Sequence, residues 1–155
     1  MKYGFVKVAA AVPAVKVADV TYNVQEIERL ITIADVEHVE VVVFPELSIT
    51  GYTCQDLFRE RLLLDKAEEG LLKLIDFTRK LDIISVVGMP IEVGSLLLNC
   101  AVVLQQGCIL AVVPKTYLPN YGEFYEKRWF ASARDLNPTT TYLAGSPVEI
   151  PLDTE

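Results

Sequence analysis

Short apolar runs alternate along this chain with longer segments in which apolar residues recur every three or four positions. The short runs are typical of buried strands, and the longer periodic segments are typical of helices packed on one face. Helices are predicted at residues 23–36 and roughly 57–81. Strands are predicted at residues 3–12, 39–44, 83–91, 96–106 and 108–114, with one more near residues 148–150.

Local signals refine these elements. Asn23 is the predicted N-cap of the first helix, and Glu26 follows three residues later as in a variant capping box. The apolar face of that helix comprises Val24, Ile27, Ile31 and Ala34. Gly70 predicts a break in the second helix. The valine-rich strand between the helices is expected to be buried on both faces.

The predicted order is strand, helix, strand, helix, strand, strand, strand. Helices between the first strands favour right-handed crossovers and a largely parallel sheet. A hairpin around Gln106-Gly107 would add antiparallel strands, and a short helix is expected within residues 120–134. The pattern therefore predicts one α/β layer pair in a single domain, residues 1–155.

Composition adds a surplus of core material. The chain has 155 residues, of which 52% are hydrophobic, and a mean hydropathy of +0.33. A domain of this size exposes much of its surface, so this surplus indicates strand faces that another subunit or the rest of a larger fold would cover.

Charge and cysteine content exclude several classes of function. The formal net charge is −7 and no lysine or arginine cluster occurs, which argues against nucleic acid or an anionic membrane as a partner. No apolar run approaches the length needed to span a bilayer, and no signal-peptide pattern is present. Three cysteines do not make an even disulfide framework, so we expect reduced thiols and a cytoplasmic protein.

Two apolar strands end in the same way, with a proline followed by a charged residue. Val43-Phe44-Pro45 leads to Glu46, and Val112-Val113-Pro114 leads to Lys115. A partly desolvated carboxylate at such a position can act as a general base, and an ammonium can stabilise an oxyanion. Taken singly, a solvated strand-end glutamate and a surface lysine are the commoner explanations. The pair is more informative than either residue alone.

An amidase that uses a glutamate and a lysine also needs a thiolate nucleophile. Cys100 and Cys108 lie in apolar strands and are expected to be core thiols. Cys54 lies in the polar loop after Glu46, but no flanking cation favours its thiolate form. His38, at a helix end, is expected to be a charge partner of the helix rather than a catalyst. The sequence therefore predicts no nucleophile within this chain.

The segment after Lys115 is rich in aromatic residues interleaved with charges. These residues would either wall a small polar pocket or form an amphipathic surface helix with an aromatic core face. Spacing alone does not decide between the two. The residues are Tyr117, Tyr121, Glu123, Phe124, Tyr125, Glu126, Lys127, Arg128, Trp129 and Phe130.

Four segments, in this order, resemble the nitrilase, or carbon-nitrogen hydrolase, superfamily. They are FPELSITGYTCQDLF (44–58), VVGMPI (86–91), LNCAVVLQQGCIL (98–110) and VPKTYLPNYGEFYEKRWF (113–130). More closely, they resemble the N-terminal glutaminase domains of bacterial glutamine-dependent NAD+ synthetases, over nearly the whole chain. The resemblance implies an α/β fold of the nitrilase-like α-β-β-α sandwich type, of which this chain would form the N-terminal part.

The resemblance also implies roles for individual residues. Glu46 matches the general base of the family, and Lys115 matches its oxyanion-stabilising lysine. Glu123 matches a further acidic residue that supports the lysine and the substrate, and Tyr121 matches a tyrosine that helps to hold glutamine. The nucleophilic cysteine of the family belongs to a later strand-end motif, which this chain does not contain.

From the resemblance we expect the first part of a glutaminase domain, inactive on its own, within a parent ligase. The parent would hydrolyse glutamine and use the ammonia to amidate nicotinic acid adenine dinucleotide to NAD+. The parent would use ATP and magnesium, whereas no cofactor is expected in this chain. Expected partners are glutamine, the rest of the same polypeptide and further copies in a homo-oligomer. The alternatives are a fragment of a free-standing amidase of the superfamily and a non-catalytic assembly module without a nucleophile.

Overall fold

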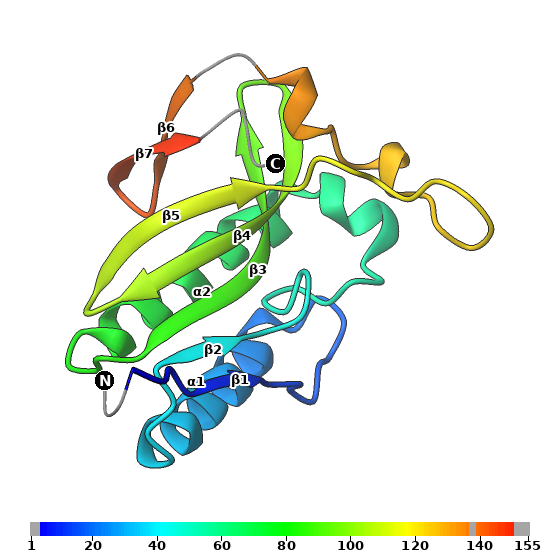
Figure 1. The fold of residues 1–155 in the computed structure, drawn as a ribbon. Helices are drawn as coiled ribbons and strands as arrows, with labels where there is room; N and C mark the ends of the chain where they lie inside the picture. The colour runs from blue at the N-terminus through cyan, green and yellow to red at the C-terminus, as the bar shows by residue number, and fades with distance from the viewer. Residues whose placement is uncertain (1–3, 137–138, 151–155) are drawn as a thin grey trace.

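The computed structural model describes residues 4–136 and 139–150, and its centre is a five-stranded sheet in the order β1-β2-β3-β4-β5 (Figure 1). The sheet is formed by β1 (Val8–Ala10), β2 (Val41–Val43), β3 (Ile84–Val93), β4 (Leu96–Gln105) and β5 (Cys108–Pro114). The strands β1, β2 and β3 are parallel, whereas β3, β4 and β5 pair antiparallel. The sheet is therefore mixed rather than largely parallel, because β3 continues into two hairpins with short turns.

Helices α1 (Val20–Val36) and α2 (Arg61–Thr78) pack together behind the sheet in the view of Figure 1. The predicted order of strands and helices is confirmed, as is the hairpin around Gln106-Gly107. Strand residues that face the helices are fully buried, including Val42, Val87 and Val102. This apolar layer between the sheet and the helices is the core of the molecule. Within the described residues, neither helix is long and apolar enough to cross a membrane.

Helix α1 begins earlier than the sequence predicted. Its N-cap is Asp19, whose side chain accepts a hydrogen bond from the Tyr22 N–H. Asn23, the predicted cap, lies inside the helix and is fully buried. Its side-chain amide donates to the Lys16 and Ile49 carbonyls and accepts from the Lys16 N–H. Asn23 thus joins the helix to two loops, a long-range role that capping patterns do not reveal.

Helix α2 is continuous through Gly70 and is preceded by a short 3₁₀ turn, η1 (Gln55–Arg59). The predicted break is wrong, because this glycine allows the two helices to approach closely. A Cβ atom at Gly70 would lie 2.7 Å from Cγ1 of Val20 and 3.0 Å from Cγ2 of Val24.

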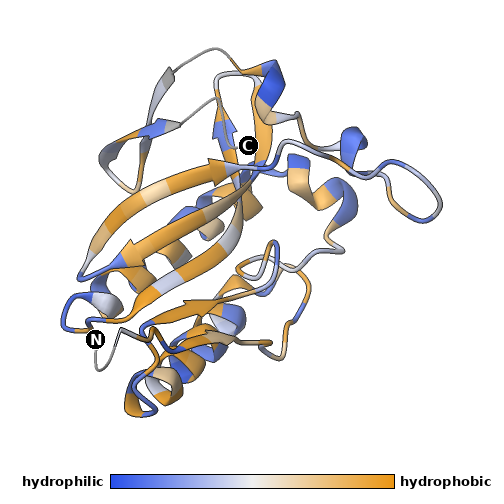
Figure 2. Cartoon of the chain, in the orientation of Figure 1, coloured by the Kyte–Doolittle hydropathy of each residue, from blue (hydrophilic) through white to orange (hydrophobic). Residues whose placement is uncertain are grey.

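The face of the sheet opposite the helices is apolar and uncovered. Val43 of β2 is 44% exposed and Val8 of β1 is 66% exposed, so the expected burial of the valine-rich strand on both faces is wrong for the residues described. Figure 2 shows the strands that face the viewer as largely hydrophobic. The surplus of apolar residues noted in the sequence therefore lies on this open face.

The segment after β5 is irregular. The short helix expected within residues 120–134 is replaced by 3₁₀ turns, η2 (Glu126–Arg128) and η3 (Ala133–Asp135). The strand expected near residues 148–150 is β7 (Ser146–Ile150), which pairs antiparallel with β6 (Thr139–Leu143). This small sheet lies near β5 in Figure 1, and Leu143 and Val148 extend the core.

Candidate active site

The loops that follow β2 and β5 bring Glu46 and Lys115 together at one edge of the sheet. Nζ of Lys115 lies 2.7 Å from Oε1 of Glu46. The two residues are separated by 69 positions in the sequence, so the contact depends on the sheet, which aligns the ends of β2 and β5. The structure therefore joins the two charged residues that each follow a strand-ending proline.

A tight turn presents Glu46. The Phe44 N–H donates to the Val86 carbonyl, and Pro45, which has no N–H to donate, ends the pairing of β2 with β3. Leu47 then adopts a left-handed conformation with φ of 52°. Gly88 of β3 lies directly beneath this turn, where a Cβ atom would be 2.3 Å from the Leu47 nitrogen. Close packing against Gly88 thus sets the position of the Glu46 backbone.

The ammonium of Lys115 is held between two carboxylates. In addition to Glu46, it contacts Glu126, whose Oε1 and Oε2 lie 2.9 Å and 2.8 Å from Nζ. Burial alone would lower the pKa of Lys115, but the hydrogen bonds with Glu126 and Glu46 outweigh that effect and raise its pKa. Lys115 is therefore a permanent cation at physiological pH, as an oxyanion-stabilising group requires.

Glu126 is a buried carboxylate, only 2% exposed, at the start of η2. Its Oε1 also accepts a hydrogen bond of 2.7 Å from the Tyr52 hydroxyl. Burial, followed by the hydrogen bond to Glu126, raises the pKa of Tyr52, so the phenol remains a donor. Tyr52 and Lys115 thus provide the partners that a buried carboxylate needs.

An exposed clasp holds η2 against the loop that follows β2. The Asp56 carboxylate accepts hydrogen bonds from the Arg128 guanidinium at 2.9 Å and 3.0 Å and from the Trp129 indole at 2.9 Å. These hydrogen bonds hold the pKa of Asp56 well below its usual range. Arg59 adds a hydrogen bond of 2.8 Å to the Arg128 carbonyl. The clasp fixes the turn that carries Glu126.

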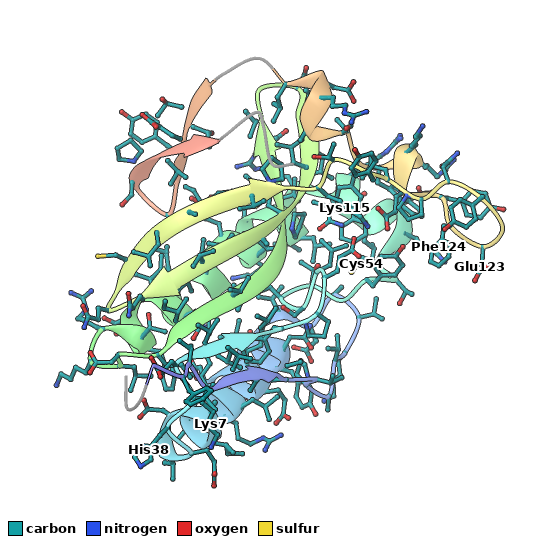
Figure 3. All side chains as sticks on the ribbon, viewed as in Figure 1. Lys7, His38, Cys54, Lys115, Glu123 and Phe124 are labelled. Carbon is teal, nitrogen blue, oxygen red and sulfur yellow. The ribbon has the colours of Figure 1, made fainter. Side chains whose placement is uncertain are left out.

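The structure does not bring Glu123 to Lys115. Glu123 is exposed in the loop after β5, and Figure 3 shows it far from Lys115. The acidic residue that contacts the lysine is Glu126, which corrects the assignment of lysine support to Glu123. The flanking residues carry a signal that distinguishes the two. Glu123 follows a glycine in a loop, whereas Glu126 precedes Trp129 and Phe130, which pack against Phe58.

Tyr121 lies in the same loop and is 73% exposed, with its ring against Phe124 at 5.8 Å between centroids. It lines a surface cavity of about 780 Å³ together with Tyr117, Lys127 and Arg134. Arg134 stacks on the Tyr117 ring and donates to its hydroxyl at 2.9 Å. The aromatic segment thus walls a polar pocket rather than forming an amphipathic helix.

A second cavity, of about 330 Å³, contains the Glu46–Lys115 pair and Asn99 of β4. It continues along the open face of the sheet, where its lining includes Val43, Val86, Ala101 and Val113. The pair therefore borders the uncovered apolar face, and any layer that packed on that face would reach it.

The three cysteines do not supply a nucleophile beside Glu46. Cys54 is 2% exposed, its thiol donates to the Thr50 carbonyl at 3.1 Å, and burial raises its pKa. Cys100 has a buried side chain, and burial raises its pKa to about 12. Cys108 is exposed at the start of β5, the end opposite Lys115.

Metal ligands and histidine contribute nothing to this site. Within the part of the chain that the structure describes, no group of three or more His, Cys, Asp and Glu side chains is placed to hold a metal ion. His38 is exposed after α1 and lies far from Lys115 in Figure 3.

Comparison with known proteins defines the class of the protein. The family model for carbon-nitrogen hydrolases matches residues 7–149, so the chain belongs to the carbon-nitrogen hydrolase family. The predicted nitrilase-like α/β fold is confirmed, and this chain matches a part of such enzymes. An amidase from Nesterenkonia sp. has the same fold, with a TM-score of 0.70 at 21% identity, over 93% of this chain and 54% of the amidase.

Closer relatives are glutamine-dependent NAD(+) synthetases, which confirms the resemblance seen in the sequence. The Mycobacterium leprae synthetase is 37% identical over 136 residues, which are 88% of this chain and 20% of the relative. The Xanthomonas campestris synthetase is 40% identical over 115 residues, which are 74% of this chain and 20% of the relative. The Cytophaga hutchinsonii synthetase structure gives a TM-score of 0.86 at 28% identity, covering 94% of this chain and 25% of that one. The chain thus spans about a fifth of the length of these curated relatives.

Proposed function

We propose that this chain is the part of a glutaminase domain that carries the general base and the oxyanion-stabilising lysine of a glutamine-dependent NAD+ synthetase. The single observation that carries the proposal is the contact of 2.7 Å between Glu46 and Lys115, with Glu126 buried behind the lysine. Two carboxylates around one ammonium keep the lysine charged and immobile. Kinship with synthetases points to glutamine as the amide.

In this reaction Glu46 removes the proton from a cysteine thiol, and the thiolate attacks the side-chain amide carbon of glutamine. Lys115 stabilises the oxyanion of the tetrahedral intermediate. Glu46 returns the proton to the amide nitrogen, the C–N bond breaks and ammonia leaves. Glu46 then activates a water that hydrolyses the thioester, which yields glutamate and restores the thiol.

The nucleophile comes from a layer that covers the open sheet face. Support for this step comes from the cavity that joins Glu46 and Lys115 to Val43 and Val113 of that face. A layer packed there buries apolar surface and reaches the carboxylate at once. The occupant is the rest of the same polypeptide, since the chain spans about a fifth of its curated relatives. Residues 1–155 alone therefore release no ammonia from glutamine.

The ammonia passes to an ATP-dependent domain of the same polypeptide, where it amidates nicotinic acid adenine dinucleotide. ATP and magnesium act in that domain, and the site around Lys115 needs no cofactor. Tyr121, in the wall of the neighbouring cavity, helps to hold glutamine. The parent is a cytoplasmic homo-oligomer, which agrees with exposed apolar side chains such as Phe5, Ile33 and Val36.

The test compares two reactions of the complete polypeptide, glutamine-dependent and ammonia-dependent NAD+ formation. Glu46→Gln abolishes the first and leaves the second intact, because only ammonia release needs the base. Glu92→Gln is the matched control, since Glu92 pairs with Arg61 on the surface. A polypeptide that hydrolyses small amides but forms no NAD+ from either nitrogen source is a free-standing amidase, and the synthetase assignment fails.

A further inference from the structure

Asn99 contacts both members of the Glu46–Lys115 pair. It is 3% exposed and lies in β4, between β3 and β5. Its side-chain amide donates a hydrogen bond to Oε1 of Glu46, and its backbone carbonyl accepts one of 2.8 Å from the Lys115 N–H. One residue of the central antiparallel strands thus connects the loops that follow β2 and β5.

The strand register explains why Asn99 is free to do this. Its partner in β3 is Pro90, which has no N–H, and β5 ends at Pro114 beside it. The regular ladder therefore stops at this level. The Asn99 carbonyl takes the first N–H beyond Pro114, which is that of Lys115, and the side chain is left to meet Glu46.

The chemistry of the amide suits a carboxylate that must accept a proton. Asn99 and Lys115 both donate to Oε1 of Glu46, and among the described residues no donor is placed on Oε2. An amide cannot take up the proton, and it orients the carboxylate without adding a second positive charge. A lysine or arginine in its place would compete for the carboxylate instead.

We propose that Asn99 is a positioning residue for Glu46, which fixes Oε1 towards Lys115 so that Oε2 is the oxygen that accepts and returns the proton. The inference rests on the proposed glutaminase function. Its content goes further, because it assigns one task to each carboxylate oxygen and derives both from a neutral side chain in a different strand.

The test measures glutamine hydrolysis by the complete polypeptide as a function of pH, with Asn99→Leu against the wild type. Loss of the amide removes a hydrogen bond to an ionised group, so kcat falls about 10- to 100-fold while KM for glutamine stays within about twofold. The acid limb of the pH profile moves to higher pH, because the ionised form of the base has lost a donor. Ammonia-dependent NAD+ formation is unchanged.

The matched control is Gln105→Leu, at the other end of β4. It also removes a side-chain amide, which donates to the Asp82 carbonyl at 2.7 Å. This variant keeps the wild-type pH profile. Asn99→Asp serves as the second variant, since it preserves size but replaces the donor with a second negative charge beside Glu46. It loses at least as much of kcat as Asn99→Leu.

Two results overturn the assignment of Asn99. One is a wild-type kcat and pH profile in Asn99→Asp. The other is a loss of activity in both Asn99 variants that matches their loss of folded protein, with the profile unmoved. A failure of the proposed function looks different, because the wild type itself then releases no ammonia from glutamine.

Discussion

Lys115 and Glu126 form an ion pair in which the carboxylate is almost completely buried and both of its oxygens lie within 2.9 Å of Nζ. Glu126 cannot act as the base that Glu46 provides, because Lys115 and Tyr52 occupy it and it lies outside the described lining of the cavity that contains Glu46. Its task is to hold the lysine. The lysine in turn keeps Glu46 at the border of the open face.

The first prediction separates Glu126 from Glu123. Glu126→Gln removes the buried charge that holds Lys115 and lowers glutamine hydrolysis by about 100-fold or more, since misplacement of an oxyanion donor costs about that much. Glu123→Gln is the matched control and changes the rate by less than about threefold, because an exposed loop carboxylate contributes little. Steady-state ammonia release by the complete polypeptide measures both. Equal losses in the two variants would contradict the assignment.

The second prediction concerns the close contact beneath Glu46. Gly88→Ala places a methyl group 2.3 Å from the Leu47 nitrogen, so the turn that presents Glu46 must move. We expect at least about a 100-fold loss of glutamine hydrolysis, because a displacement of about 1 Å has that effect on a reacting group. Ammonia-dependent NAD+ formation persists.

The control for that variant is Gly94→Asn, in the turn between β3 and β4. Gly94 has φ of 61°, which asparagine tolerates, and a Cβ atom at this position would meet no atom within 4 Å among the described residues. This variant keeps the wild-type rate. A Gly88→Ala variant with full activity would show that the turn is not held by this contact.

The third prediction follows from the low pKa of Asp56. A group whose pKa is depressed by folding contributes stability above its unfolded pKa, and that contribution disappears as pH falls through the folded pKa. Between about pH 5 and about pH 2 the wild type should therefore lose more thermal stability than Asp56→Asn. The difference should shrink in about 1 M salt, because the carboxylate is exposed.

Melting curves across this pH range measure the contribution of Asp56, with Asp65→Asn as the control. Asp65 also pairs with an arginine on the surface, Arg61, but has no indole donor. Parallel pH dependence in the wild type and Asp56→Asn would mean that the clasp on η2 contributes nothing to stability.

The fourth prediction tests the hydrogen bond from Tyr52 to Glu126. Tyr52→Phe leaves one oxygen of a buried carboxylate with fewer donors, at a cost of about 1–3 kcal/mol. Chemical denaturation followed by near-ultraviolet signals measures the loss, and Tyr142→Phe, with an exposed side chain, is the control. No change in the Tyr52→Phe midpoint would show that Glu126 does not depend on the phenol.

Local sequence patterns predicted the elements whose signals are local. The hairpin at Gln106-Gly107, the order of strands and helices, and the strand-ending prolines before Glu46 and Lys115 all follow from spacing and turn chemistry. The position of Asn23 inside α1 did not, because its amide serves loops that are distant in the sequence. The continuity of α2 at Gly70 likewise depends on contact with another helix.

The candidate site was predictable to the same extent. Its two charged ends could be read from the strands, but Glu126, Tyr52 and Asn99 are recognised only when three separate loops and strands meet around Lys115. Choosing Glu126 over Glu123 required knowledge of which of the two is buried. Sequence proximity to Lys115 carried no such information.

The most direct test of the central claim is ammonia release from L-glutamine by the complete polypeptide, measured for the wild type, Lys115→Met and Lys66→Met. Lys66 pairs with Glu69 on the surface of α2 and controls for loss of a lysine. The account predicts release by the wild type and Lys66→Met, and a loss of at least about 100-fold in Lys115→Met with ammonia-dependent NAD+ formation retained. Glutamine hydrolysis that continues at the wild-type rate in Lys115→Met would contradict it.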